Sequence, residues 1–330
     1  MPSPRLSILT ISFNCWELLD KCLHSIMRSN FPWHEILIID NASADGTLSN
    51  LMQNYPQVRV VQNERNTGFL RAVNQGFSLA TGDRILLLDA DTELQPDAVG
   101  IMSSFLDLHP DVCMVAPRTL DPTGEVQETA RNFPTPINGL FGRQSLLTKL
   151  FPTNPFSCRY LMRENLNATQ PYRIEMVSAA CLMFRKELLT KVGMLDEKFS
   201  RFTGYWVDAD WCKRIQKAGG IKFCLPDAVI VHHENNKPHR KKNPNRIIEF
   251  HTGALRFYRL HYTWGWLDPR SLLAAVLLAC RCIMLLAINA TKDAPRDELD
   301  PLSRSPLAPT TNAALETSTT SRTQHVNKQQ

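Results

Sequence analysis

Short apolar runs alternate with stretches of helical spacing through residues 6–117, and this alternation restricts the fold more than any other feature of the chain. Each run is rich in Ile, Leu and Val and leads into a turn that contains Asn, Asp or Gly, which predicts a β-strand followed by an α-helix. We therefore expect an α/β domain whose mainly parallel sheet carries helices on both faces. The predicted strands are 6–13, 35–40, 58–62, 83–89 and 112–117, and the predicted helices are 16–27, 46–55, 70–79 and 97–109.

The rest of the chain is less regular. Residues 118–173 are rich in Pro, Asn and Thr and show weak periodicity, which is unusual for an ordinary connector of this length. We interpret this segment as a functional excursion from the domain. Regular patterns return at 174–186, in a helix at 209–218, in two short runs at 221–225 and 228–233, in an aromatic helix at 247–262 and in an apolar segment at 272–288.

Charge and cysteine content exclude several classes of protein. The net charge of +5 is small for a dedicated nucleic-acid binder, and the nine cysteines include no C-x-x-C pair, so neither a zinc cluster nor a disulfide framework is expected. The early first strand leaves no room for a secretory signal, so we expect a cytoplasmic protein. Residues 291–330 contain no aromatic side chain and balance five basic with five acidic residues, which indicates a disordered tail.

The basic excess is concentrated in one segment. Residues 235–248 contain five basic side chains and no acidic one, which equals the whole net charge. Such a run usually forms a solvated or phosphate-facing surface, so we expect it to contact phosphate groups rather than nucleic acid. The five basic residues are Lys237, Arg240, Lys241, Lys242 and Arg246.

Two aspartates follow the most apolar run. The predicted strand 83–89 ends on Asp89-Ala90-Asp91, and a predicted helix begins soon after it. Ligands of parallel sheets bind beyond the carboxyl ends of the strands, where two carboxylates can share one hard divalent cation with a diphosphate. An isolated pair of this kind is usually a helix cap with a solvated turn acid. The apolar strand before the pair makes the cation site our preferred interpretation.

Two further features of the first half suggest a nucleotide site. Asp40 and Asn41 end the second run, where an acid can accept hydrogen bonds from a nucleobase or ribose, although an Asx turn with a helix cap explains the same residues. Arg71 could reach a phosphate, with an ordinary surface arginine as the alternative. No G-x-G-x-x-G or Walker motif follows any predicted strand, which argues against a dinucleotide dehydrogenase or a P-loop ATPase.

The second half contributes two pairs of candidate side chains. Asp208 and Asp210 precede or open a helix, and burial beside Trp206 would raise the pKa of Asp208 to a value that suits a general base. Carboxylates at a helix start are also common caps. His232 and His233 end an apolar run and must face opposite sides of a strand, so one of them could bind a metal, with a structural histidine as the alternative.

Taken in order, these segments resemble the family 2 glycosyltransferases, in particular the rhamnosyltransferase-like members that build bacterial surface polysaccharides. The resemblance covers roughly residues 5–260 and implies a GT-A fold with a mixed, mainly parallel sheet. It also implies inverting transfer of a sugar from a nucleoside diphosphate sugar. The segments that carry it are SILTISFN, EILIIDNASADGT, NTGFLRAVNQG, LLLDADT, YWVDADWCKRIQKAGG and AVIVHH.

The resemblance assigns roles to individual residues. Asp89 and Asp91 match the motif that binds Mg²⁺ or Mn²⁺, with Asp91 as the expected direct ligand, and His232, or failing it His233, matches a position that touches the metal in some members. Asp208 matches the catalytic base. The family commonly has Glu-Asp where this chain has Val207-Asp208, so Asp210 stays a rival base. The expected nucleotide-sugar contacts are Thr10, Ser12, Asn14, Asp40, Asn41, Arg71, Asp89 and Ala90.

We expect four parts along the chain. Residues 1–118 would bind the nucleotide sugar, 119–262 would bind the acceptor and complete the catalytic half of the same domain, 263–290 would form a membrane-associated apolar helix, and 291–330 would be the tail. The charged Arg281 near the middle of the apolar segment disfavours a spanning helix. A helix on the inner membrane face, with Arg281 reaching lipid phosphates, and a buried terminal helix are the two alternatives.

The expected reaction moves a sugar, with L-rhamnose from dTDP-L-rhamnose as the best guess, to a saccharide or polyprenyl-diphosphate-linked acceptor at the cytoplasmic membrane surface. The alternatives are a sugar nucleotidyltransferase and a non-catalytic nucleotide-sugar-binding protein. The first would carry a Gly-rich basic loop after the first strand, and SFNCWE is not one. The second is suggested by Val207, although the retained acids argue against it.

Overall fold

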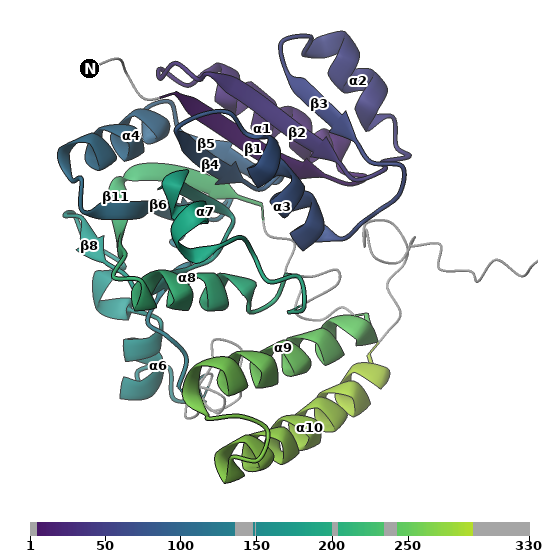
Figure 1. Cartoon of the computed structure of the whole chain (residues 1–330), viewed down its shortest axis with the longest axis vertical. Helices are drawn as coiled ribbons and strands as arrows, with labels where there is room; N and C mark the ends of the chain where they lie inside the picture. Colours follow the sequence, from purple (N-terminus) through teal and green to yellow (C-terminus); the bar gives the residue numbers. More distant parts are fainter. Residues whose placement is uncertain (1–4, 136–147, 149, 200–203, 234–242, 293–330) are drawn as a thin grey trace, which may run out of the picture.

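The structure is a computed structural model that describes residues 5–135, 148, 150–199, 204–233 and 243–292. Four of the five basic residues expected to face phosphates, Lys237 to Lys242, lie outside the described residues, as does the tail after residue 292. The α/β class expected from the sequence is confirmed, because strands and helices alternate through the first half of the chain (Figure 1).

The strands lie where the apolar runs predict them, with several short additions. Residue ranges of the strands are β1 Leu6–Ser12, β2 Glu35–Asp40, β3 Arg59–Gln62, β4 Arg84–Leu88, β5 Thr92–Leu94, β6 Val112–Leu120, β7 Ala130–Arg131, β8 Tyr172–Arg173, β9 Met176–Val177, β10 Cys181–Arg185 and β11 Ile221–His232. Those of the helices are α1 Trp16–Met27, α2 Thr47–Asn54, α3 Phe69–Leu79, α4 Ala98–Leu108, α6 Pro155–Tyr160, α7 Glu187–Val192, α8 Val207–Lys217, α9 Pro244–Tyr262 and α10 Pro269–Ala290, with a 3₁₀ turn at Arg163–Asn165.

The main sheet is mixed and mostly parallel in its first half. The strand order is β3-β2-β1-β4-β10-β6-β11-β5, with β8 added to β11, while β7 and β9 form a separate antiparallel pair. β1, β2, β3 and β4 run parallel, and their register places Ser12 opposite Asp40. The carboxyl ends of β1, β2 and β4 therefore meet at one edge, where an α/β sheet binds its ligands.

Both faces of the sheet are covered by helices, because the strand side chains that alternate across it are apolar on each side. Leu9, Leu37 and Leu87 belong to the core that α3 and α8 complete. Ile8 and Ile38 belong to the core on the other face, which α1, α2 and α4 complete. A buried sheet of this kind holds the ends of its strands in fixed positions, and this rigidity is what a site at those ends requires.

Gly76 allows α3 to lie close to β1. A Cβ atom at this position would overlap the buried side chain of Leu9. The absence of a side chain at Gly76 therefore sets the distance between α3 and β1.

The second half differs from the sequence expectation in three places. The two short runs 221–225 and 228–233 form one strand, β11, whose register shifts between Leu225 and Val229. Residues 174–186 split into β9 and β10, and β10 inserts antiparallel between β4 and β6. The short strand β5 was not predicted, because three residues are too few to show a period; it pairs antiparallel with β11.

The C-terminal helices α9 and α10 lie side by side as a helical hairpin, separate from the sheet (Figure 1). α9 is fixed to α8, because Phe257 and Phe250 contact the ring of Trp206. α10 is fixed to α9 by hydrogen bonds from Arg281 Nη1 to His251 Nε2 at 2.9 Å and from Arg259 Nε to Ser271 Oγ at 2.8 Å. The hairpin thus has one side attached to the domain and one side turned away from it.

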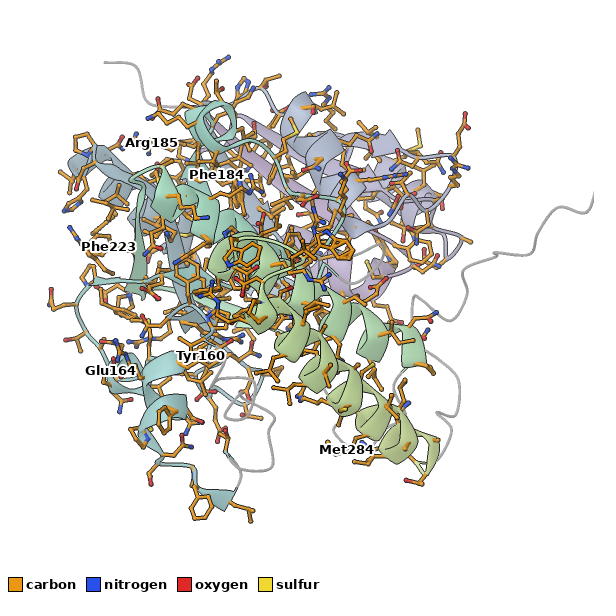
Figure 2. The ribbon with its side chains drawn as sticks, turned by 60° about the horizontal axis from the view of Figure 1, so that its bottom comes forward. Tyr160, Glu164, Phe184, Arg185, Phe223 and Met284 are labelled. Atoms are coloured by element: carbon orange, nitrogen blue, oxygen red, sulfur yellow. The ribbon has the colours of Figure 1, made fainter. Side chains whose placement is uncertain are left out.

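α10 is long and apolar enough to cross a membrane, and it is the one such helix among the described residues. Its most apolar stretch is only 6% buried, so it does not form the buried terminal helix that was one alternative. Met284, labelled in Figure 2, lies on this helix far from the sheet and is 54% exposed. Arg281 points inward to α9, where its guanidinium also lies 5.7 Å from the centre of the Phe250 ring, and not outward to lipid phosphates as the surface-helix interpretation supposed.

Candidate active site

Two loops at the carboxyl edge of the sheet hold each other in place. After β1, the backbone N–H of Asn14 donates to Ser43 Oγ at 2.9 Å, and after β2 the N–H of Ala44 donates to Asn14 Oδ1 at 2.7 Å. Asn14 adopts a positive φ of 49°, a conformation that asparagine tolerates better than most residues. These two hydrogen bonds therefore join the two loops that carry predicted nucleotide-sugar contacts.

Asp40 is fully buried at the end of β2, and only one of its carboxylate oxygens has a protein partner. Oδ2 accepts a hydrogen bond from the N–H of Ser43 at 3.1 Å, whereas Oδ1 has no partner among the described residues. The buried hydroxyl of Thr10 in β1 is in the same situation. Buried polar atoms are normally paired, so these two unpaired ones, at the edge of the sheet where α/β proteins bind their ligands, are candidates for ligand contact.

Asn41, Ser12 and Arg71 make contacts within the protein. Asn41 Oδ1 accepts hydrogen bonds from Thr67 N at 3.0 Å and from Asn63 Nδ2 at 3.1 Å, so its amide holds the loop after β3. Ser12 Oγ lies 3.6 Å from Cys15 Sγ. Arg71 Nε donates to Glu197 Oε2 at 3.0 Å on the surface. The structure thus gives Asn41 a role in shaping the site and pairs Arg71 with an acid.

Asp89, Asp91 and His232 form a compact group of potential metal ligands. One ligand atom from each lies within 4.8 Å of the others, and His232 Nε2 is 3.4 Å from Asp91 Oδ1. The pairing of β5 with β11 produces this arrangement, because it sets His232 opposite Thr92, directly after Asp91. Ala90 is buried between the two aspartates. A group that comes from opposite ends of the sequence is thus assembled by one short strand.

The electrostatics of this group suit a divalent cation. The pKa of Asp89 is raised to about 7, chiefly by burial and also by repulsion from Asp91, while His232 acts in the opposite direction. Two carboxylates held this close repel each other unless a cation lies between them. Two carboxylates and one imidazole are donors that Mn²⁺ and Mg²⁺ sites use, so the residues present fit the metal that the family resemblance implies.

His233 faces the other side of the strand. Its Nε2 lies 2.7 Å from Glu93 Oε1, while its backbone N–H donates to the carbonyl of Asp91 at 2.9 Å. Of the two rival histidines, His232 is therefore the one that joins the two aspartates, as expected when neighbouring side chains of a strand point to opposite faces.

Asp208 lies in the first turn of α8, close to the potential metal ligands Asp89, Asp91 and His232. Its Oδ2 accepts a hydrogen bond from the N–H of Ala179 at 3.3 Å. The pKa of Asp208 is raised to about 6, because burial outweighs the opposing effects of the Ala179 N–H and the positive charge of Arg131. Trp206, two residues before Asp208 and directly before α8, has a positive φ of 70°, which is a strained conformation for a bulky side chain. Strain of this kind is typical of functional turns, and here it orients the start of α8.

Ala179 and Ala180 connect the two acidic centres. The N–H of Ala179 donates to the side chain of Asp208, and the carbonyl of Ala180 accepts from the backbone N–H of Asp89 at 2.9 Å. Asp208 also contributes to the repulsion felt by Asp89. The candidate base and the candidate metal ligands therefore lie in one site.

Asp210 is occupied by other contacts. Its side chain is 3% exposed and lies 2.8 Å from both Arg214 Nε and His261 Nε2. A carboxylate held by two partners in the interior is a structural ion pair and has little freedom to accept a substrate proton. The geometry therefore favours Asp208 over Asp210.

Two residues of the site were not identified from the sequence. Gln127 contacts His232, and Arg131 lies close enough to Asp208 to lower its pKa. Both belong to the irregular segment 118–173, where no motif or period marks them. The pairing of β7 with β9 sets Arg131 opposite Met176. This pairing, which the sequence does not predict, brings Arg131 near Asp208.

Comparison with known proteins defines the class. The profile of glycosyl transferase family 2 matches residues 7–193, more than half of the chain, so the chain belongs to this family. A characterised relative, the N-acetylglucosaminyl-diphospho-decaprenol L-rhamnosyltransferase of Mycobacterium tuberculosis, is 24% identical over 275 residues, which cover 80% of this chain and 87% of that protein. The family resemblance expected from the sequence is thereby confirmed.

Two solved structures share the fold. GalNAc-T7 with UDP, GalNAc and Mn²⁺ has a TM-score of 0.54 and 16% identity, over 78% of this chain and 50% of that longer one. The mannosyltransferase PcManGT from Pyrobaculum calidifontis, in complex with GDP-Man and Mn²⁺, has a TM-score of 0.52 and 16% identity, over 87% of this chain and 79% of that one. At these identities the likeness confirms the expected GT-A fold of glycosyltransferases.

Proposed function

We propose that this chain transfers a sugar from a nucleoside diphosphate sugar to an acceptor hydroxyl with inversion at the anomeric carbon. The observation that carries the proposal is the meeting of Asp208 with the group Asp89, Asp91 and His232 at one edge of the sheet. This arrangement offers a base on one side and a place for a charged leaving group on the other.

The chemistry is a single displacement. Asp208 Oδ takes the proton of the acceptor hydroxyl, the hydroxyl oxygen forms a bond to the anomeric carbon, and the bond from that carbon to the diphosphate oxygen breaks with its electron pair leaving on the diphosphate. Asp89, Asp91 and His232 would hold Mn²⁺ or Mg²⁺. When bound, the cation neutralises the charge of the leaving diphosphate. The raised pKa of Asp208 makes it a stronger base than an ordinary carboxylate.

The donor is proposed to carry a uracil or thymine base. The unpaired Oδ1 of Asp40 accepts a hydrogen bond, and the ring N–H of these bases is a single donor of matching character. The Mycobacterium tuberculosis relative is named as an L-rhamnosyltransferase, so we propose dTDP-L-rhamnose as the donor.

The acceptor is proposed to be a polyprenyl-diphosphate-linked saccharide, because the same relative is named for a decaprenol-diphosphate-linked sugar. An acceptor of this kind resides in the membrane. The outward side of α10 provides a surface that fits this requirement: its exposed apolar residues are Leu272, Leu273, Val276, Leu277, Ile283, Met284 and Ile288. Trp264 and Trp266, 69% and 68% exposed in the turn before α10, have the side chains that favour a membrane interface.

We propose that α10 lies along the inner face of the membrane. A helix of 22 residues is about 33 Å long, which is sufficient to span. However, α10 is held against α9, and α9 is fixed to the catalytic domain, so a spanning orientation would require the hairpin to open. With Arg281 directed at His251, the outward side of α10 presents apolar groups to the lipid.

A donor screen tests the proposed function. Calorimetry of the full chain with Mn²⁺ and a set of UDP-, dTDP- and GDP-sugars should give tightest binding for dTDP-L-rhamnose, followed by transfer to a lipid-linked saccharide. Formation of a nucleoside triphosphate and a sugar 1-phosphate when pyrophosphate is added to the bound donor would instead indicate a nucleotidyltransferase. Binding without either reaction, with any acceptor, would indicate the non-catalytic alternative suggested by Val207.

A further inference from the structure

Gln127 contacts His232 through both polar atoms of its side-chain amide. Its Nε2 donates to the carbonyl oxygen of His232 at 3.0 Å, and its Oε1 lies 3.0 Å from Nδ1 of the same imidazole. The backbone of Gln127 is fixed as well, because its N–H donates to Thr119 O and its carbonyl accepts from Thr129 N, each at 2.8 Å. Hydrogen bonds therefore fix both the backbone and the side-chain amide of Gln127.

These contacts define which atom of the amide faces which partner. A carbonyl oxygen only accepts, so the amide atom that faces the His232 carbonyl must be the NH₂ group. The oxygen Oε1 is then the atom that faces Nδ1, and an amide oxygen also only accepts. Nδ1 must therefore carry a hydrogen, and in the neutral imidazole the lone pair lies on Nε2.

Nε2 is the atom that faces Asp91, at 3.4 Å from its Oδ1. We infer that Gln127 is a positioning residue that sets the Nδ1–H tautomer and the ring orientation of His232, so that the Nε2 lone pair points to the metal. This inference rests on the proposed metal site of Asp89, Asp91 and His232. Residues that hold a metal-binding histidine in this way typically change metal affinity by about 10–100-fold when they are lost.

The neighbouring His233 shows what the Gln127 contact accomplishes. Its Nε2 lies 2.7 Å from Glu93 Oε1 and is engaged by a carboxylate of the same sheet. In His232 the contact with Gln127 is made through Nδ1 instead, and Nε2 lies beside Asp91 at the proposed metal position. The two adjacent histidines therefore differ in which ring nitrogen contacts a neighbouring side chain: Nδ1 of His232 contacts Gln127, and Nε2 of His233 contacts Glu93.

Metal binding and tautomer state test the inference directly, without reference to turnover. Binding of Mn²⁺ alone to the full chain is measured from the free-ion signal in electron paramagnetic resonance, for the wild type, Gln127→Leu and the control Gln95→Leu, an exposed glutamine directly after β5. We expect Gln127→Leu to weaken Mn²⁺ binding by about 10–100-fold and Gln95→Leu to leave it unchanged. Nitrogen NMR of His232 should show a protonated Nδ1 in the wild type and a mixture of tautomers in Gln127→Leu.

The outcomes separate this inference from the proposed metal site. Loss of Mn²⁺ binding in Asp91→Ala together with unchanged binding in Gln127→Leu would overturn the role of Gln127 and leave the metal site in place. Unchanged binding in Asp91→Ala would overturn the site itself. Gln127→Leu in a His232→Ala background should have the same Mn²⁺ affinity as His232→Ala alone, and any additional loss contradicts action through His232. If Gln127→Leu folds poorly, the NMR measurement on the wild type still decides, because an unprotonated Nδ1 of His232 would overturn the inference.

Discussion

Asp210 and His261 are joined across 2.8 Å in the interior, with side chains only 3% and 4% exposed, and this contact attaches α9 to α8. The acid that sequence reasoning left as a rival base is therefore part of the connection between the helical hairpin and the catalytic domain. The first two predictions separate a structural role of Asp210 from a catalytic role of Asp208.

Asp210→Ala should act on stability. Breaking a buried ion pair by removing one partner leaves the other charge buried and costs about 3–5 kcal/mol. We expect the free energy of unfolding in urea to fall by an amount of this order, while nucleotide-sugar affinity of the protein that remains folded stays near the wild-type value. An unaltered unfolding midpoint combined with complete loss of turnover would favour Asp210 as the base.

Asp208→Asn should act on the chemical step. The amide keeps the size of the carboxylate but cannot take a proton, so we expect kcat to fall by about 10²–10⁴-fold. Donor affinity, measured by calorimetry with Mn²⁺, should stay near the wild-type value, since Asp208 acts in proton transfer and not in donor binding. Turnover close to that of the wild type would exclude Asp208 from proton transfer.

The pH profile should report the base. Burial raises the pKa of Asp208 to about 6, and a general base must be ionised to work, so kcat/KM should decrease below about pH 6. Arg131 lowers this pKa through its positive charge, hence Arg131→Leu should move the acid limb of the profile to higher pH, and Arg131→Lys should move it less. A limb that stays in place in Arg131→Leu would show that another group limits the rate at low pH.

Metal dependence should follow Asp91 and not its neighbour. We expect Asp91→Ala to lose both Mn²⁺ binding and activity, because it removes one of three grouped ligands. Glu93→Ala is the matched control, since Glu93 pairs with His233 on the other side of the strand. Activity of Asp91→Ala that still rises on addition of Mn²⁺ would move the metal site elsewhere.

Membrane association should depend on the outward side of α10. The variant Leu273→Asp with Leu277→Asp should lose flotation with anionic lipid vesicles, because each charge opposes burial in the apolar layer. Leu108→Asp, at an exposed leucine at the end of α4, should float like the wild type. Alkaline carbonate should release the wild-type chain from membranes, whereas resistance to carbonate would indicate a spanning helix.

The first half of the fold could be predicted because its signals are local. The strand and helix patterns of residues 6–117 reflect burial on both faces of a sheet, and the observed bounds of β1, β2 and α1 agree closely with them. Insertion of β10 between β4 and β6 could not be predicted, because strand order depends on contacts far apart in sequence. The same limit explains why β5 and the fusion of two runs into β11 were not expected.

The candidate site shows the same division. Asp89, Asp91, Asp208 and His232 were selected from the sequence because a strand end or helix start marks each of them. The choice of His232 over His233, and the pairing of Asp210 with His261, required the structure. Gln127 is unmarked in sequence, since its significance lies only in the partner that the fold places beside it.

The link through Ala179 and Ala180 has a consequence for how such a chain can diversify. Because consecutive residues hold the side chain of Asp208 and the backbone of Asp89, the separation of the two acidic centres is built into one short stretch of backbone. A substitution there would displace both centres together and disturb the reaction for every substrate. New acceptors are therefore more readily accommodated by changes outside this stretch of backbone, which leave the separation of the two acidic centres intact.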